Sequence, residues 1–567
     1  MSRRDQAHPD SRRKPKARCR KKTGGTTHYE TLEARQMLAV AKVSLKSGLL
    51  SILSNNTNTS VELSYSGSKV VVSDLSSGKS WKYSQTKVQS ISFQGGDGND
   101  RFISLASGIR VTARGGGGND VLQGGSGDDF LYGDWGSDSL LGLAGNDSLF
   151  GGADADWISA ASGDDRIFGE GGDDRAWGGL GNDLMFGGAG NDQFVGDEGN
   201  DRLFGETGND ILWGSDGADL LIGSLGDDQL VGGLGNDQLN GQAGNDRLWG
   251  QEGNDTLIGI DGLFAEYLEG GTGRDVIWRD AAFGNADTAW GNTAEDKVHD
   301  VSRFDNNADL TLDGDRIADP ALHGNFVYKS FSGKLFSSTG PQATDAIQGS
   351  LADCYLIAGL SAMAMDTPWT LQANMVDFND GTYGVCLDND YFRVDGDLPV
   401  ASASSVTPAF AKFGAEGSLW VAIAEKAFAH HRSLDNSYRA IEFGSQVEIY
   451  QAMGSLSTDD YGFNVFSNAT QLANQLFALW NNYRAVCVNF NGPRPTNTFG
   501  VVMGHAYTVY SFQRNSAGQV TGVTLRNPWG FDGSSRDSNP NDGLVTLTPD
   551  ELFALRSVGS ITAARFA

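Results

Sequence analysis

Cysteine is scarce in this chain, and long hydrophobic stretches are missing. Four of the 567 residues are cysteines, Cys19, Cys354, Cys386 and Cys487. So few thiols in so long a chain argue against a disulfide framework. No run of about 18 apolar residues occurs, so we expect no membrane-spanning helix. The basic start lacks a clear apolar segment, and a standard signal peptide is not evident.

Positive charge is scarce in the middle of the chain. The formal net charge is −28, and residues 115–259 hold 28 acidic residues against four basic ones. Residues 1–22 are the opposite, with ten Lys/Arg and two Asp/Glu. The acidic run would repel itself unless cations bind there, and it excludes nucleic acid as a partner of this region. The length of the chain predicts two or more domains.

A nine-residue repeat fills this acidic region. Asp recurs at every ninth position from Asp120 to Asp255, sixteen times in all, and Gly stands two residues earlier in fifteen cases. A large apolar residue stands two positions after the Asp in fifteen cases, as at Leu122, with Ala176 the exception. The pattern predicts one short strand per repeat, with the apolar side chain inward and glycines in the turns.

Oxygen ligands are abundant in such a repeat, because the turn carbonyls and the Asp carboxylates lie together. They suit a hard cation such as Ca²⁺. The register resembles the GGxGxDxUx repeat of calcium-binding parallel β-rolls in RTX proteins. The alternative is a flexible Gly/Asp-rich linker, which does not keep a nine-residue phase. The predicted calcium ligands are Asp120, Asp129, Asp138, Asp147, Asp156, Asp165, Asp174, Asp183, Asp192, Asp201, Asp210, Asp219, Asp228, Asp237, Asp246 and Asp255.

After about residue 300 the regular spacing of Asp and Gly stops. Three residues in this part of the chain, Cys354, His505 and Asn527, are candidates for catalysis. Cys354 lies at the first turn of an apolar segment, 351–365, that predicts a buried helix. His505 and Asn527 follow on two segments that predict strands. Cys, His and Asn are the nucleophile, the base and the orienting group that a thiol protease needs. A helix N-terminus at Cys354 favours the thiolate.

Five separated motifs in this region resemble the protease core of the calpain family. They are QGSLADCYLIAGLSAMA (348–364), the helical stretch 416–454, GHAYTV (504–509), LRNPWG (525–530) and the end of the chain, 542–565. The resemblance implies a papain-like α+β core over residues 305–567. It gives Cys354, His505 and Asn527 the catalytic roles and Gln348 a share of the oxyanion site. Trp529 would shield the contact between Asn527 and His505 from water.

One residue departs from the calpain pattern. Tyr355 follows the nucleophile where calpains usually have Trp, and we expect activity to persist with an altered substrate fit. The other thiols, Cys386 and Cys487, lie in apolar strand contexts and predict buried core residues. His430 and His431 are expected at the surface.

The chain therefore predicts a multidomain protein with a parallel β-roll (β-solenoid) followed by an α+β papain-like core. The expected parts are a basic leader (1–40), a β-rich cap (41–114), the roll (115–280), a linker (281–304) and the protease core (305–567). The leader contains LEARQML (32–38), which resembles a motif near the start of planctomycete exported and surface proteins; a disordered basic tail is the alternative.

The predicted function is a calcium-dependent cysteine endopeptidase that hydrolyses protein and peptide substrates. The alternative is a calcium-binding surface or adhesion protein whose calpain-like module is inactive. Both the repeats and the leader predict a bacterial extracellular or cell-surface location, with the cytoplasm as the alternative. The expected partners are calcium ions and protein substrates, without nucleic acid.

Overall fold

The fold is known from a computed structural model. It describes residues 40–566 apart from 55–56, 263, 282–286, 292, 294, 305–318, 323–324, 349–352, 433–437, 439–444, 483–484, 492–500, 503–504 and 529–543. The predicted leader, with its LEARQML motif, and Trp529 lie outside the described residues. No helix among the described residues is long and apolar enough to cross a membrane.

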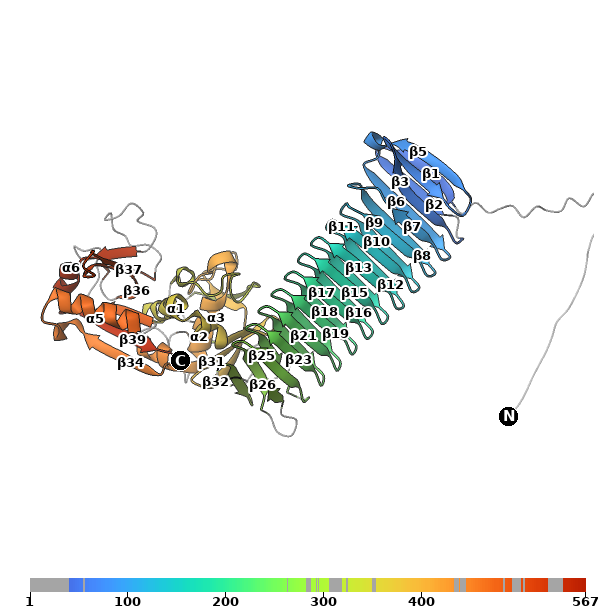
Figure 1. Cartoon of the computed structure of the whole chain (residues 1–567). Helices are drawn as coiled ribbons and strands as arrows, with labels where there is room; N and C mark the ends of the chain where they lie inside the picture. Colours follow the sequence, from blue (N-terminus) through green and yellow to red (C-terminus); the bar gives the residue numbers. More distant parts are fainter. Residues whose placement is uncertain are drawn as a thin grey trace, which may run out of the picture.

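A parallel β-solenoid forms a rod, with a mixed α and β module at one end (Figure 1). The solenoid makes about 11 turns over residues 90–301, and each turn gives one strand to each of two sheets. The predicted β-roll is therefore confirmed. The first sheet contains the parallel strands β6 (Ser90–Asp97), β8 (Arg110–Gly117), β10 (Phe130–Trp135), β12 (Ser148–Ala153), β14 (Arg166–Gly171), β16 (Leu184–Ala189), β18 (Arg202–Thr207), β20 (Leu220–Leu225), β22 (Gln238–Ala243), β24 (Thr256–Gly259), β26 (Val276–Asp280) and β28 (Lys297–Val301).

The second sheet stacks in the same way on the opposite side of the core. Its parallel strands are β7 (Arg101–Ser104), β9 (Val121–Gly125), β11 (Ser139–Ala144), β13 (Trp157–Ser162), β15 (Arg175–Leu180), β17 (Gln193–Glu198), β19 (Ile211–Asp216), β21 (Gln229–Leu234), β23 (Arg247–Glu252), β25 (Tyr267–Thr272) and β27 (Thr288–Trp290).

The apolar residue of each repeat forms the core between the two sheets. Leu122, Leu131 and Leu140 are fully buried, as are the equivalent residues up to Leu257. Because each strand pairs with the strand two repeats later in the sequence, equivalent side chains stack along the rod. Phe150 and Phe168 on its outer face lie 4.9 Å apart between ring centroids. Such stacking stabilises parallel in-register strands beyond their backbone hydrogen bonds.

Antiparallel strands cover the far end of the rod. Strands β1 (Val40–Lys46) and β2 (Leu49–Ser54) form a hairpin on one sheet, while β3 (Ser60–Ser66), β4 (Lys69–Asp74) and β5 (Lys79–Ser84) extend the other. The edge strands β1 and β5 carry exposed lysines. Charged side chains at a sheet edge discourage strand pairing with another protein chain. Strands β2 and β3 also pair in parallel with β6 and β7, so the parallel stacking already begins inside the segment predicted as the cap.

At the other end the sheets also extend further than the sequence predicts. Strands β27 and β28 lie within residues 281–304, the predicted linker, and pair in parallel with β25 and β26. The prediction missed them because these last coils no longer keep the nine-residue phase. The roll therefore continues up to the edge of the second module.

The second module contains six helices among its described residues, and three sheets. The helices are α1 (Cys354–Asp366), α2 (Pro368–Ala373), α3 (Trp420–Arg432), α4 (Gln446–Ala452), α5 (Ala469–Asn482) and α6 (Pro549–Ala554). The main sheet has the order β34 (Ser457–Gly462), β39 (Gly559–Arg565), β35 (Ala485–Phe490), β36 (His505–Arg514), β37 (Val520–Arg526) and β38 (Leu544–Leu547). The smaller sheets are β29 (Val327–Ser330) with β33 (Asp397–Val400), and β30 (Met375–Asp377), β31 (Thr382–Leu387) and β32 (Asp390–Asp395).

The roll and the second module share a buried apolar cluster. Ile258, Ile260, Val276 and Trp278 of the last coils, which we call the docking surface, pack against residues of α2, β30 and β31 and against Phe378, which directly follows β30. Polar contacts accompany this packing. The side-chain amide of Gln238 donates to the carbonyl of Asp377 at 2.7 Å. The side-chain amide of Asn240 donates to the carbonyl of Phe378 at 2.7 Å. His299 Nε2 lies 2.6 Å from the carbonyl of Ala373.

Candidate active site and carboxylate ladder

Cys354 is the first residue of α1, as the sequence predicts. The preceding Asp353 is the N-cap residue, and its carbonyl accepts the N–H of Leu356 at 2.8 Å. The thiol is half-buried, while the next ten residues of the helix are buried. The unpaired N–H groups at the start of a helix carry partial positive charge, which stabilises a thiolate over a thiol.

His505 and Asn527 lie on two paired strands of the main sheet. His505 is the first residue of β36, and Asn527 follows the last residue of β37. The strands are antiparallel with Thr508 opposite Arg526, so Asn527 lies beside the beginning of β36. His505 is 2% exposed and Asn527 is fully buried. The predicted strand positions of both residues are therefore confirmed.

Two hydrogen bonds fix α1 to this sheet one helical turn after Cys354. The hydroxyl of Thr508 donates to the carbonyl of Ala358 at 2.8 Å, and the thiol of Cys487 donates to the same carbonyl at 3.3 Å. Thr508 lies three residues after His505 on β36. The first turn of the helix and the beginning of the strand are therefore held at a fixed separation.

Gln348 is hydrogen-bonded to the residue that follows Asn527. Its backbone N–H donates to the carbonyl of Pro528 at 2.7 Å, and its side chain is 6% exposed. The segment before α1 is thereby attached to the segment after β37. The structure thus attaches Gln348 to the segment that contains Asn527, and it holds Cys354 and His505 on adjoining elements.

Arg526 strengthens the same connection, and the sequence did not single it out. Its guanidinium donates to the carbonyls of Ala346 at 3.0 Å and Thr344 at 3.1 Å, and to the hydroxyl of Ser361 at 3.2 Å. It is 3% exposed, and burial lowers its pKa to about 10. The sequence offered one indication of this role, because Arg526 ends an apolar strand and directly precedes the candidate Asn527.

A buried pair of carboxyl groups lies at the start of α1, and the sequence also missed this pair. Glu425 of α3 forms a side-chain hydrogen bond with Asp353, and its other contact is the N–H of Ala411, which donates at 2.7 Å. Burial, followed by the charge of Asp353, raises the pKa of Glu425 well above its ordinary range. A protonated Glu425 that donates to Asp353 satisfies both groups.

Tyr355 does not face outward from the helix. It is 3% exposed, its hydroxyl accepts a hydrogen bond from Arg432 at 2.7 Å, and the same guanidinium lies over its ring. The residue that departs from the calpain pattern is therefore part of the core. An altered substrate fit from Tyr355 stays a prediction.

The other described thiols are poor nucleophiles. Cys386 and Cys487 are buried, as predicted, and burial raises their pKa values to about 11 and about 12. His430 differs from its predicted surface position. It is 9% exposed beside Phe392, and burial lowers its pKa to about 4. His431 is partly exposed.

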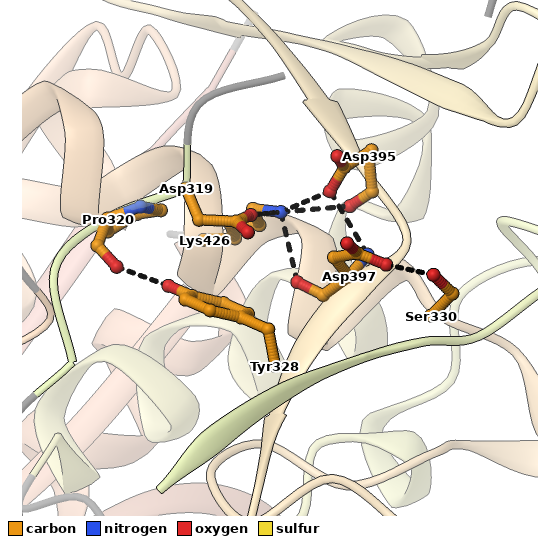
Figure 2. Close-up of polar contacts among 7 residues, drawn as sticks. All are labelled: Asp319, Pro320, Tyr328, Ser330, Asp395, Asp397 and Lys426. Carbon is orange, nitrogen blue, oxygen red and sulfur yellow. Dashed lines mark hydrogen bonds and ion pairs between the residues drawn. The ribbon is translucent and has the colours of Figure 1, made fainter. Parts of the chain in front are cut away.

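Three aspartates gather around a lysine in the second module (Figure 2). Lys426 Nζ contacts the carboxylate of Asp319, lies 2.5 Å from that of Asp395, and donates to the carbonyl of Asp397 at 3.0 Å. Lys426 is fully buried. Because an ammonium already occupies the centre of these acids, this group is a structural ion cluster that attaches the segment around Asp319 to α3.

The aspartates of the repeats form a continuous ladder along the roll. One carboxylate oxygen joins adjacent coils: Oδ1 of Asp138 accepts the N–H of Asp120 at 2.6 Å, and the pattern recurs up to Asp255, which accepts from Asp237 at 2.9 Å. The other oxygen, Oδ2, is buried without a hydrogen-bond partner in every predicted ligand except Asp129. Buried acceptors of this kind are costly unless something satisfies them.

These unsatisfied oxygens converge with backbone carbonyls. A side chain added at Gly133 would place its Cβ 2.2 Å from Asp138 Oδ2 and 2.3 Å from the carbonyl of Gly151. Only glycine therefore fits at this point. Burial raises the pKa of the sixteen predicted ligands to between about 6 and about 8. Grouped carboxylate and carbonyl oxygens fit calcium, whose charge would keep the carboxylates ionised.

Known families match both parts of the chain. Residues 328–541 match the model for the calpain family of cysteine proteases. Segments between residues 112 and 278 match the RTX calcium-binding nonapeptide repeat. Both resemblances seen in the sequence are therefore confirmed. Repeats of this family bind calcium.

Curated relatives match the second module at low identity. A calpain-type cysteine protease, DEK1, from Zea mays is 27% identical over 264 residues, which is 43% of this chain and 11% of the relative. Calpain-9 from Mus musculus is 26% identical over 230 residues, 37% of this chain and 32% of the relative. The calpain-1 catalytic subunit from Bos taurus is 26% identical over 226 residues, which is 35% of this chain and 29% of the relative. The chain thus spans no more than about a third of these relatives.

Proposed function

We propose that this chain, which joins a calpain-type peptidase domain to RTX calcium-binding repeats, is a calcium-dependent cysteine endopeptidase. The observation that carries the proposal is the attachment of α1 to β36 through the carbonyl of Ala358. Cys354 lies one turn before that point and His505 three residues before Thr508, on the facing strand. A nucleophile and a base on two rigid, mutually fixed elements are pre-organised for attack.

Each residue has a distinct part in the proposed reaction. His505 takes the proton of Cys354, and the thiolate attacks the carbonyl carbon of a peptide bond. The N–H groups at the start of α1 and the Gln348 side chain stabilise the oxyanion. His505 then protonates the leaving amine, an acyl-enzyme remains, and water that loses a proton to His505 releases the second product. Asn527 orients the His505 ring from the neighbouring strand, and Trp529 is proposed to cover that contact.

Calcium is proposed to act through the roll. When bound, it would supply positive charge beside the unpartnered Oδ2 atoms of the ladder. The roll is in direct apolar contact with α2, β30 and β31 of the peptidase domain. A roll that folds fully only with calcium would therefore hold this half of the domain in place only with calcium. Such a requirement fits an extracellular or cell-surface location, where free calcium is plentiful.

Casein cleavage by the full chain tests the proposal. Cys354→Ser should abolish cleavage and leave the melting temperature unchanged, whereas the matched variant Cys19→Ser should cleave like the unchanged protein. Cleavage should also be lost when calcium is chelated. Activity that persists in Cys354→Ser would overturn the assignment, and a folded protein that never cleaves would favour the inactive calpain-like module on a calcium-binding surface protein.

A further inference from the structure

Tryptophans recur at every second strand of the second sheet. They belong to one line of paired residues, which runs through Trp177, Val195, Trp213, Val231, Trp249, Glu269 and Trp290. We call the four tryptophans of this line the tryptophan row. The strands that carry it follow one another along the rod (Figure 1). Neighbouring strands lie about 4.8 Å apart, so consecutive tryptophans of the row are separated by about 9.6 Å.

The tryptophan row faces away from the core of the roll. The residue before each of the first three tryptophans is fully buried between the sheets; these residues are Ala176, Leu212 and Leu248. Successive side chains of a strand point to opposite faces, so the tryptophans lie on the outer face. The first three are partly exposed, and Trp290 is 57% exposed. Solvent therefore reaches all four indoles.

The two sheets of the roll use outward aromatic residues in different ways. On the first sheet they occupy successive strands and stack on one another, as do Phe168 and Phe186, whose rings lie 5.3 Å apart with planes inclined by 6°. Those rings use their faces to stabilise the rod. In the tryptophan row, Val195 and Val231 stand between the first three indoles. Because valine is much shorter than tryptophan, the indoles project beyond the side chains that separate them.

Hydrogen-bonding side chains line one flank of the tryptophan row. They stand two positions before it on their strands and are Arg175, Gln193, Gln229 and Arg247. All of them are at least partly exposed. Amide and guanidinium groups donate hydrogen bonds to hydroxyl and ether oxygens. This flank therefore fits a ligand that is rich in oxygen.

A groove of about 390 Å³ lies along the other flank. Its lining includes Gly179, Leu180, Asp197, Glu198, Ser215 and Asp216. These residues lie on the three successive strands β15, β17 and β19, so the groove runs in the same direction as the tryptophan row. Its carboxylates accept hydrogen bonds from hydroxyl groups. The face thus offers flat apolar rings with donors on one side and acceptors on the other.

This combination is the chemistry that recognises a sugar chain. The C–H face of a pyranose ring packs against an aromatic ring, and its hydroxyls need donors and acceptors around it. In an extended β-1,4-linked chain every second sugar presents the same face. Its disaccharide repeat is close to two strand spacings, which is the interval of the tryptophan row.

Charge selects among sugar chains. Asp197, Glu198 and Asp216 lie in the groove beside the tryptophan row, within a roll that has 28 acidic residues against four basic ones. A uronate or sulfated chain would be repelled by these carboxylates. The hydroxyls of an uncharged chain can instead donate to them.

We propose that the tryptophan row and the groove beside it bind an extended, uncharged β-1,4-linked polysaccharide along the axis of the rod. The peptidase domain contacts the roll through the docking surface, which lies on and next to strands of the first sheet. The proposed ligand and the peptidase domain therefore use opposite sheets, and a bound chain leaves the peptidase domain attached. The inference does not depend on whether the peptidase domain cleaves substrates.

Isothermal titration of the full, calcium-loaded chain with hexasaccharides tests the proposal. Six sugars make three disaccharide repeats, which match the three intervals of the tryptophan row. We expect cellohexaose or chitohexaose to bind, and comparing the two identifies a glucan or its N-acetylated counterpart as the better ligand. Maltohexaose, whose α-1,4 links make it curl, should bind at least about tenfold more weakly.

Three results of these titrations would overturn the proposal. One is the failure of both β-1,4-linked hexasaccharides to bind. Another is equal binding of maltohexaose, since the spacing of the tryptophan row would then have no role. The third is tighter binding of oligogalacturonate than of cellohexaose and chitohexaose, which would assign an acidic chain instead.

Substitutions in the tryptophan row locate the site. Trp213→Ala should weaken binding on the order of tenfold, because it removes one aromatic contact, and Trp213→Phe should lose less. Trp249→Ala provides the same test if Trp213→Ala fails to fold by circular dichroism in calcium. Trp135→Ala, an exposed residue of the first sheet, is the control and should bind like the unchanged chain. Unchanged affinity in both Trp213→Ala and Trp249→Ala would contradict the proposal.

Discussion

The hydroxyl of Thr508 donates a 2.8 Å hydrogen bond to the carbonyl of Ala358, and this contact joins the two halves of the peptidase domain. One partner belongs to the helix that begins at Cys354, and the other to the strand that begins at His505. The two partners lie far apart in the sequence. The proposed nucleophile and base are therefore held in position partly by a buried hydrogen bond that neither of them makes.

Thr508→Val should loosen that connection. The substitution removes the donor and keeps the shape, and the Cys487 thiol still donates to Ala358, so we expect a loss of about 1 kcal/mol in stability. Activity should fall further, on the order of tenfold, because a small displacement of a nucleophile is costly. Chemical denaturation and casein cleavage measure the two effects. Thr524→Val, which loses a bond to Thr546 on the same sheet, is the control and should keep its activity.

Arg526→Met should be more damaging. It leaves the carbonyls of Ala346 and Thr344 without their donor inside the core, and we expect a loss of about 3 kcal/mol in the free energy of unfolding. Urea denaturation checks this value. Arg514→Met, at an exposed end of β36, is the comparison and should cost under about 1 kcal/mol. Equal effects of the two variants would refute the role of Arg526.

Glu425 should give the peptidase domain a pH-dependent stability. Its pKa is raised in the folded state, so the folded protein binds a proton more tightly than the unfolded chain does. Stability should therefore decline as the pH rises above the ordinary pKa of a glutamate. Glu425→Gln keeps a donor toward Asp353 and an acceptor for Ala411, and it should remove most of this decline. Denaturation midpoints at pH 5 and pH 8 compare the variants, with Glu425→Leu expected to lose about 2 kcal/mol at both.

Much of this architecture follows from local sequence patterns. The nine-residue phase fixes which side chains point inward, so the roll and its buried Leu122 could be predicted without any knowledge of distant contacts. The start of α1 at Cys354 follows in the same way from an apolar run. The strands within residues 281–304 could not be found, because the longer coils at this end carry no repeated spacing. The contacts of Arg526 and Glu425 were out of reach since their partners lie far away in the sequence.

The burial of His430 shows the same limit. A histidine beside charged residues on a helix predicts a solvent-exposed face, yet α3 is buried on nearly every side. Periodicity indicates exposure only when one face of a helix is free. His430 is buried because β32 packs against α3 and places Phe392 beside it.

The calcium-free roll should be more stable in acid than at neutral pH. The ladder aspartates have folded pKa values between about 6 and about 8, above the ordinary value of 3.8. The folded roll thus binds more protons than the unfolded chain between about pH 4 and pH 8, and its stability falls as the pH rises through that window. In chelator, circular dichroism should show a higher melting temperature at pH 5 than at pH 8. Millimolar calcium should remove this difference, and a melting temperature in chelator that rises with pH would contradict the account.

Trp278→Ala should detach the roll from the peptidase domain. Trp278 is fully buried between the two parts, and its removal leaves a cavity that costs about 3–5 kcal/mol. Limited proteolysis should then cut between the roll and the domain in calcium, where the unchanged chain resists. Trp135→Ala, which removes an exposed tryptophan of β10, should leave the digestion pattern unaltered.

The most direct measurement is covalent labelling of the full chain with an epoxide thiol inhibitor, followed by intact mass and peptide mapping. The account predicts one adduct, on Cys354, that forms in millimolar calcium, is suppressed by chelator, and does not form in His505→Ala. An adduct that forms equally well without calcium, or a folded calcium-loaded protein whose Cys354 is never modified, would contradict a calcium-dependent cysteine peptidase.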